Sequence, residues 1–174
     1  MASKDPLRGL PEQDFDGTGI KVGIVCARWN PEICGSLLDG AVTTLQSAGA
    51  QVTVERVAGA YELPLAASVM LPQFDGVLVI GCLVKGETMH FEYIAEAVTQ
   101  GVMRLNLDSQ KPVIYGVLTV LNTRQAKERS GLDGGENSGI EWAKTLMESC
   151  RHCQKYKSGR NSPSSAAASK DRTC

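Results

Sequence analysis

Apolar residues recur along this chain in two rhythms, which divide it into strands and helices. Short apolar segments rich in valine and isoleucine, typical of buried strands, occupy residues 20–26, 51–57, 76–80 and 112–120. Patterns typical of helices occupy residues 33–48, 65–71, 91–105, 125–129 and 138–153. Strands and helices therefore alternate along most of the chain.

Capping and turn residues set the expected limits of the helices. Asn30 is placed to cap the first helix, and Pro31 suits its first turn. Gly49 is a stop signal for the same helix. Asn122 or Thr123 caps the helix that follows the fourth strand.

The alternation predicts an α/β fold. Strands separated by helical crossovers form a parallel sheet with helices on both faces, joined by right-handed connections. We expect a three-layer α/β/α arrangement around a four-stranded parallel sheet of flavodoxin-like type. The chain of 174 residues is long enough for one domain, placed at residues 20–154. Residues 1–19 are interpreted as a flexible arm and residues 155–174, rich in Ser, Lys and Ala, as a disordered tail.

Composition removes several classes of function. The net charge of −1 and the 5% aromatic content argue against nucleic-acid binding. No apolar run approaches the length of a membrane span, and the polar first 19 residues resemble neither a signal nor a transit peptide. The expected location is the cytoplasm.

Six cysteines give little sign of metal or redox chemistry. Cys26, Cys34 and Cys82 lie in or beside apolar segments and are interpreted as small buried hydrophobes. Cys150 and Cys153 form a single C-x-x-C without a second pair, which is weak evidence for zinc. We interpret them as incidental cysteines near the tail, and we expect no metal.

Polar and aromatic side chains gather just past the strand ends, where open parallel sheets bind ligands. They are Trp29, Tyr61, Glu62, Lys85, Glu87, Thr88, His90 and Asn122. The histidine stands between a strand and a helix, where an imidazole suits proton transfer near neutral pH. A solvated loop histidine is the alternative.

These residues offer two kinds of pocket. Trp29 and Tyr61 could sandwich a flat heterocycle, unless either ring fills a gap in the core. Gly86, Glu87 and Thr88 could present N–H groups and a hydroxyl to a phosphate. The candidates for a cation that closes this site are Arg28, Lys127 and Arg129, each of which is otherwise a surface charge. The chain lacks the phosphate-loop, dinucleotide, zinc-protease and serine-hydrolase signatures.

Three motifs, in order along residues 20–148, resemble the lumazine synthase family. They are G-A-Y-E-L-P at 59–64, G-C-L-V-K-G-E-T-M-H-F-E-Y-I at 81–94, and G-V-L-T at 116–119 followed by Q-A-K-E-R-S-G at 125–131. The A-R-W-N at 27–30 is similar to the fungal branch of that family.

The resemblance implies an enzyme of riboflavin biosynthesis that makes 6,7-dimethyl-8-ribityllumazine. Its substrates would be 5-amino-6-(D-ribitylamino)uracil and 3,4-dihydroxy-2-butanone 4-phosphate, and no cofactor or metal is implied. His90 would be the proton donor. The residues implied to bind substrate are Trp29 (stacking on the uracil), Ala60, Tyr61, Glu62, Cys82, Leu83, Val84, Glu87 and Thr88 (phosphate), Tyr115 and Arg129. A non-catalytic flavin- or heterocycle-binding protein is the alternative, because the Trp29 pocket could also hold riboflavin.

The resemblance also implies an assembly. Tyr115 and Arg129 match positions that reach a neighbouring subunit's site, and the family's basic unit is a cyclic pentamer. The long turn at 131–137 favours a free pentamer over a shell. The N-terminal arm would add a strand to the neighbouring subunit's sheet. Ser138 stands where many relatives have Lys or His, so a basic substrate contact is absent there.

Overall fold

The computed structural model describes residues 15–158, and most of the predicted arm and tail lies outside this range. The strands are β1 (Lys21–Ala27), β2 (Gln51–Val57), β3 (Gly76–Val84) and β4 (Val113–Val120). The helices are α1 (Pro31–Ser47), α2 (Leu63–Met70), α3 (His90–Ser109), α4 (Thr123–Arg129) and α5 (Ser138–Ser158). Two short 3₁₀ turns, Ala60–Glu62 and Leu71–Gln73, flank α2.

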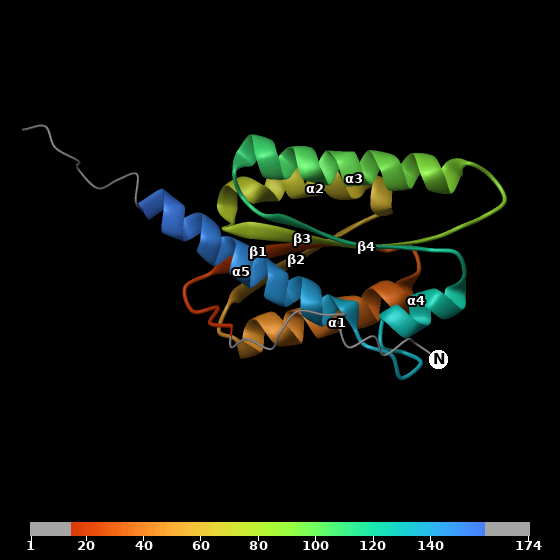
Figure 1. Cartoon of the computed structure of the whole chain (residues 1–174), viewed down its shortest axis with the longest axis horizontal. Helices are drawn as coiled ribbons and strands as arrows, with labels where there is room; N and C mark the ends of the chain where they lie inside the picture. Colours follow the sequence, from red (N-terminus) through yellow and green to blue (C-terminus); the bar gives the residue numbers. More distant parts are fainter. Residues whose placement is uncertain (1–14, 159–174) are drawn as a thin grey trace, which may run out of the picture.

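The four strands form one parallel sheet in the order β2-β1-β3-β4. Helices α2 and α3 cover one face, and α1, α4 and α5 cover the other (Figure 1). The predicted three-layer α/β/α, flavodoxin-like fold is therefore confirmed. No helix within residues 15–158 has the length and apolarity needed to cross a membrane.

Each face of the sheet carries its own apolar core because side chains alternate along a strand. Leu78 and Ile80 of β3 pack toward α1 and α5 in one core. Val77 and Val79 pack with residues of α2 and α3 in the other. All four are fully buried. The sheet is thus fixed between two packed layers, which holds its strand ends in place.

Helix α1 begins as predicted at Pro31, but Asn30 does not cap it with its side chain. Asn30 instead adopts the left-handed conformation, with φ 54° and ψ 58°, and its side chain donates a hydrogen bond to the Cys82 carbonyl. Gly49 has φ +88°, as expected for a residue that ends a helix. Asn122 does cap α4, accepting the N–H of Gln125 at 3.0 Å.

Two elements are longer than their patterns predict. Strand β3 continues past Ile80 to Val84 because β4 pairs with it as far as the Val84–Val120 pair. Helix α5 continues past Cys153 to Ser158, so the first residues of the predicted tail are helical. The longer strand matters for function, because its added residues 81–84 lie at the carboxyl edge of the sheet.

The cysteines near the sheet are buried as predicted, but the interpretation of Cys150 as an incidental cysteine is wrong. Cys26, Cys34 and Cys82 all belong to the core. Cys150 is also a core residue, and a Cβ added to Gly76 would lie 2.8 Å from its sulfur. It is therefore a packing residue of α5 rather than an incidental cysteine.

Candidate functional site

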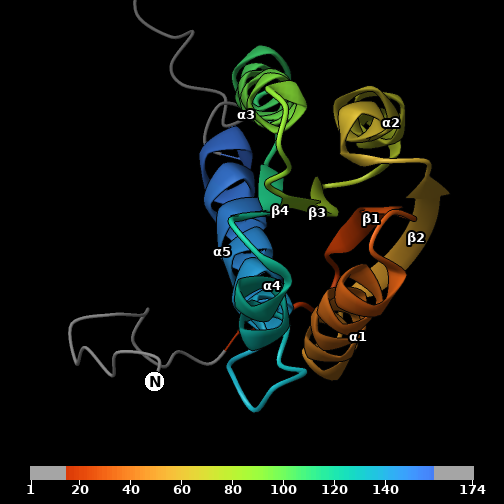
Figure 2. The same cartoon turned by 90° about the vertical axis from the view of Figure 1, so that its right-hand side faces the viewer.

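The carboxyl ends of the four strands form one edge of the sheet, seen in Figure 2. Backbone hydrogen bonds tie neighbouring strand ends together. The N–H of Arg28 donates to the Val57 carbonyl at 2.9 Å, joining β1 to β2. The N–H of Lys85 donates to the Val120 carbonyl at 2.9 Å, joining β3 to β4. Loops that start here are anchored at their first residue.

The chain turns in opposite directions after β1 and β3, which makes their junction the switch point of the sheet. Ligands of open parallel sheets bind at such a point. The last pair between these strands is Cys26–Ile80, whereas β3 runs on to Val84. Residues 81–84, here called the β3 extension, are paired with β4 on one side and have left β1 on the other.

The backbone groups of the β3 extension alternate between these two sides. The N–H of Lys85 is directed to β4, so the backbone N–H and carbonyl of Leu83 are directed there as well. The backbone groups of Cys82 and Val84 are directed to the opposite side, toward the switch point. The Cys82 carbonyl is occupied there, because Asn30 Nδ2 donates to it at 2.9 Å. The backbone groups of Val84 remain directed to the switch point.

Trp29 is the second residue after β1 and is 72% exposed. It lines a hollow of about 290 Å³ together with Arg28, Asn30, Pro31 and Ala58. A Cβ added to Gly59 would lie 3.3 Å from Trp29 Cδ1, so the glycine lets the indole approach the backbone after β2. The ring is an open aromatic face beside the ends of β1 and β2, and the alternative that it fills a core gap is wrong.

Ala60, Tyr61 and Glu62 form the short turn after β2. The Glu62 carboxylate accepts the N–H of Gly59 at 2.9 Å, which closes the turn. Ala60 is buried against Gly81 at the start of the β3 extension, whereas Tyr61 is 61% exposed. The turn thus joins the end of β2 to the β3 extension, and it leaves the tyrosine ring accessible.

The loop between β3 and α3 carries the predicted phosphate and proton-transfer residues. Glu87, Thr88 and His90 are all exposed, and His90 is the first residue of α3. Lys85 and Glu92 form an ion pair across the base of this loop, with side chains that are 44% and 31% exposed. The hydrogen bond from Lys85 holds the pKa of the Glu92 carboxyl below its ordinary value.

The structure does not bring Tyr115 or Arg129 next to Trp29 within one chain. Tyr115 lines a separate hollow of about 530 Å³ between α3 and β4, with Phe91 and Leu121. Arg129 is exposed at the end of α4 and takes part in none of the ion pairs within residues 15–158. Ser138 begins α5 and is half-buried.

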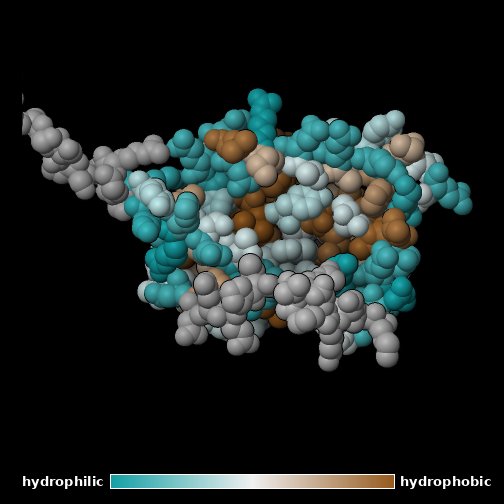
Figure 3. Space-filling model, in the orientation of Figure 1, coloured by the Kyte–Doolittle hydropathy of each residue, from teal (hydrophilic) through white to brown (hydrophobic). Residues whose placement is uncertain are grey.

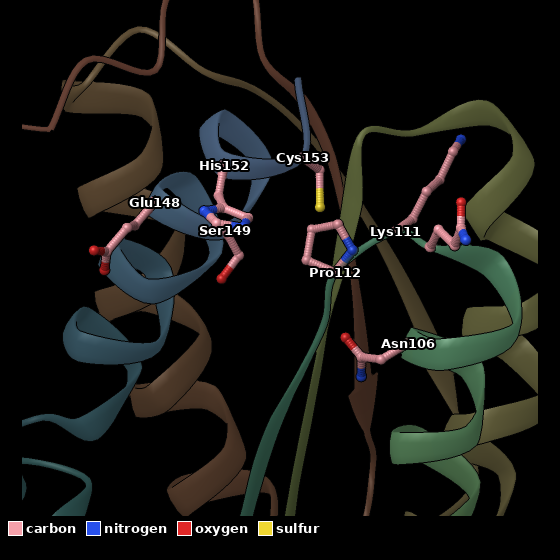
Figure 4. A pocket seen from close by; sticks show the side chains of 8 residues that line it. Asn106, Lys111, Pro112, Glu148, Ser149, His152 and Cys153 are labelled. Atoms are coloured by element: carbon pink, nitrogen blue, oxygen red, sulfur yellow. The ribbon is translucent and has the colours of Figure 1, made fainter. Parts of the chain in front are cut away.

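A further hollow, of about 450 Å³, lies at the opposite edge of the sheet (Figure 4). Cys153 points into it, whereas Cys150 faces the core, so the C-x-x-C does not form a joint site. The Lys111 amine donates hydrogen bonds to the carbonyls of Leu71 and Phe74, at 2.9 and 2.7 Å. Within residues 15–158, no group of His, Cys, Asp or Glu converges as metal ligands.

Sequence reasoning missed two features of the site. The first is the bridge from Asn30 to Cys82, because a pattern of the form Asn-Pro before a helix indicates a cap. The second is the β3 extension, because Gly81 and the polar residues after it indicate a turn. The only sequence signal for the bridge is that asparagine tolerates the left-handed conformation.

Comparison with known proteins gives one consistent result. The profile described as 6,7-dimethyl-8-ribityllumazine synthase matches residues 19–154. A protein of that name from Corynebacterium efficiens is 46% identical over 135 residues, covering 76% of this chain and 85% of its own. Its namesake from the fission yeast Schizosaccharomyces pombe is 44% identical over 148 residues, covering 82% and 93%. The namesake from Mycobacterium avium is 42% identical over 141 residues, covering 79% and 88%.

The match covers every element of the sheet and the whole carboxyl edge. It includes β1 with Trp29, the β3 extension and the loop that carries His90. The relatives compared include a fungal protein, in line with the similarity of residues 27–30, and all of them are named as synthases. The chain belongs to the 6,7-dimethyl-8-ribityllumazine synthase family.

Proposed function

We propose that this enzyme condenses 5-amino-6-(D-ribitylamino)uracil with 3,4-dihydroxy-2-butanone 4-phosphate. The products are 6,7-dimethyl-8-ribityllumazine, inorganic phosphate and water, and the step is the penultimate one of riboflavin biosynthesis. Membership of the family supports the reaction. The observation that carries the site is that an exposed indole, an unpaired strand edge and a polar helix start all lie at the carboxyl edge of the sheet.

The uracil ring stacks on Trp29, and its polar edge meets the backbone of the β3 extension. The support is the direction of the Val84 N–H and carbonyl, which point to the switch point and suit the donors and acceptors of a pyrimidine. The adjoining residues that bind the ring and ribityl chain are Ala60, Tyr61, Glu62, Cys82 and Leu83. Stacking and edge contacts together hold the amine in one orientation.

The phosphate binds at the loop before α3, through the backbone of Glu87 and Thr88 and the hydroxyl of Thr88. The support is the start of a long helix at His90, whose first N–H groups are unpaired within the helix and favour an anion. His90 donates the proton as phosphate leaves and as water is lost when the ring closes. Its exposure at the helix start leaves the imidazole free to reach the substrate.

The assembly is a homopentamer in which Tyr115 and Arg129 complete a neighbouring subunit's site. Their separation from Trp29 within one chain supports this proposal. Apolar side chains also gather between α3 and α5 on the face where β4 forms the edge (Figure 3). Further exposed apolar residues on α2 and α3 are Leu65, Val69, Tyr93, Met103 and Leu107. Such a surface is typical of proteins that bury it against partners.

Four finer points complete the proposal. The arm, residues 1–19, adds a strand beside β2, whose residues 53–56 are exposed at the sheet edge. The catalytic domain is residues 20–154, followed by the tail. Riboflavin binds on Trp29 as a ligand rather than a cofactor, since its ring system is similar to the product. The enzyme works in the cytoplasm.

The test is to follow the fluorescence of the lumazine product. Purified enzyme is mixed with both substrates and compared with a protein-free blank, because the two compounds also condense unaided. We expect clear acceleration by the wild type. His90→Ala should lower kcat by about 100-fold, the low end of acid–base effects, since binding and orientation persist.

Two results would contradict these assignments. No acceleration by correctly folded wild type would remove the proposed reaction. An unchanged kcat in His90→Ala would remove the proton-donor role and leave the reaction to orientation alone. Lys144→Ala, a change on the surface of α5, serves as the control that should leave turnover unaffected.

A further inference from the structure

Asn30 has an unusual backbone for its residue type. Within residues 15–158 only Asn30 and Gln110 are non-glycine residues with positive φ, at 54° and 52°. Asparagine tolerates this conformation better than most residues, but surrounding contacts are still needed to hold it. Asn30 stands at the switch point between Trp29 and α1, so the contacts that hold it also bear on the proposed uracil site.

The contacts of Asn30 join three elements. Its side-chain Nδ2 donates to the Cys82 carbonyl of the β3 extension at 2.9 Å. Its own carbonyl accepts the N–H of Cys34 at 3.0 Å, a hydrogen bond at the start of α1. The Cys34 thiol in turn donates to the carbonyl of Trp29 at 3.2 Å. The end of β1, the start of α1 and the β3 extension are therefore held together around one residue.

The bridge replaces strand pairing where pairing stops. Beyond the Cys26–Ile80 pair, β1 and β3 no longer follow each other in register. The hydrogen bond from Asn30 to Cys82 spans that point and is partly buried. The indole of Trp29 is mostly exposed, so few side-chain contacts fix it, and its place depends on its backbone. That backbone is set by the neighbouring Asn30.

We infer that Asn30 is a positioning residue that sets the place of Trp29 relative to the β3 extension. The inference rests on the proposed function, because the gap between the indole and Val84 is then the uracil slot. Asn30 acts through Trp29 and Cys82 and takes no proton. Its loss should therefore impair the uracil substrate and leave the phosphate substrate, held at the loop before α3, almost unaffected.

Asn30→Gly tests this inference because glycine keeps the positive φ and removes only the bridge. We expect the KM for ribitylaminouracil to rise roughly 3- to 10-fold, as for loss of one partly buried hydrogen bond. The KM for butanone phosphate should change less than about 2-fold. Asn30→Asp keeps shape and backbone but turns an acceptor toward the Cys82 carbonyl, so it should raise the KM for the uracil substrate at least as far.

The matched control is Gln110→Gly, the same kind of change at the other left-handed residue. Gln110 lines the hollow at the opposite edge of the sheet, so both KM values should remain at the wild-type level. Equal rises in the two KM values for Asn30→Gly, or no rise in either, would overturn the positioning role. An inactive wild type would instead overturn the proposed function, so the two failures are distinguishable. Asn30→Asp decides the matter if the glycine variant does not fold.

Discussion

Cys82 places a thiol beside the proposed uracil site, and its surroundings decide its reactivity. The side chain is 3% exposed, and burial raises its pKa to about 11. The reactive form of cysteine is the thiolate, which at pH 8 would then be about 0.1% of Cys82. The residue is therefore suited to packing and not to nucleophilic chemistry.

We expect iodoacetamide at pH 8 to modify Cys153 well before Cys82. Cys153 is half-buried and points into an open hollow, whereas Cys82 is enclosed. Labelling of Cys82 should rise about tenfold for each pH unit while the fold persists, because the thiolate fraction rises by that factor below the pKa. Mass spectrometry of the two peptides measures both rates. Equal labelling of Cys82 and Cys153 at pH 8 would contradict the enclosed environment.

Asn30 and Asn122 show what a sequence can predict at the level of one residue. Both precede a helix, and both were expected to cap it. Asn122 does so, because its side chain needs only the N–H of Gln125, three residues away. Asn30 instead bonds to Cys82, which is 52 residues away. A local sequence pattern includes Gln125, the partner of Asn122, but it cannot include Cys82, the partner of Asn30.

At the scale of elements, the loop between β3 and α3 needs a constraint from its ends. Residues 85–90 are all exposed, so packing contributes little to their order. The Lys85–Glu92 ion pair closes the base of the loop, and the Lys85 amine also lies 5.8 Å from the centre of the Phe91 ring. These contacts join the end of β3 to the first turn of α3, and so they limit the movement of Thr88 and His90.

We expect Glu92→Gln to lower the melting temperature by about 1–3 °C at pH 7, the range of a partly exposed ion pair. The folded-state pKa of Glu92 is lowered, so its contribution is present above the ordinary pKa of about 4.3 and is lost as pH falls through the folded value. The difference from wild type should therefore shrink as pH falls below that ordinary value, and it should also shrink in high salt.

Glu96→Gln is the control for that series. Glu96 lies one turn further along α3, is exposed, and accepts a hydrogen bond from Gln100 rather than pairing with Lys85. The melting temperature of the Glu96→Gln variant should equal that of the wild type at every pH. A Glu92→Gln difference that stays constant as the pH is lowered would show that the substitution acts through packing and not through charge.

Strand and helix order was predictable, whereas the exact ends of the elements were not. The second strand was predicted at residues 51–57 and lies there, paired in register with Lys21–Ala27. The third strand was expected to stop at Ile80, and its extension to Val84 follows from pairing with β4. The wall of the proposed site is that extension. Its conformation depends on a strand that comes some thirty residues later, as the register with residues 113–120 records.

At the scale of the whole molecule, the residues of the proposed site lie apart within one chain. Trp29 lines a hollow beside the ends of β1 and β2, and Tyr115 lines another beside β4. Arg129 lies on α4, which contacts α1 through the Lys127–Glu32 ion pair and through Ser36, whose hydroxyl donates to the Ser130 carbonyl. Periodicity could not predict this division, and only the family resemblance suggested that two positions serve a neighbour.

A pentamer with shared sites predicts complementation between two damaged chains. Trp29→Ala and Arg129→Ala should each lower kcat/KM roughly 10-fold or more, because one loses stacking and the other a charge-assisted contact to phosphate. Co-expressed in equal amounts, they should assemble at random. About one site in four would then pair an intact Trp29 from one chain with an intact Arg129 from its neighbour. Activity should recover to about a quarter of the wild-type value.

The alternative arrangement gives a different result. If Trp29 and Arg129 served a site within the same chain, every site in a mixed particle would carry one of the two changes, and no activity would return. Light scattering should give a mass five times that of the chain, and mass spectrometry should confirm that both variants share a particle. Mixed pentamers without recovery would contradict shared sites. Recovery would assign the two residues to neighbouring subunits, since no rearrangement within one chain can restore a missing side chain.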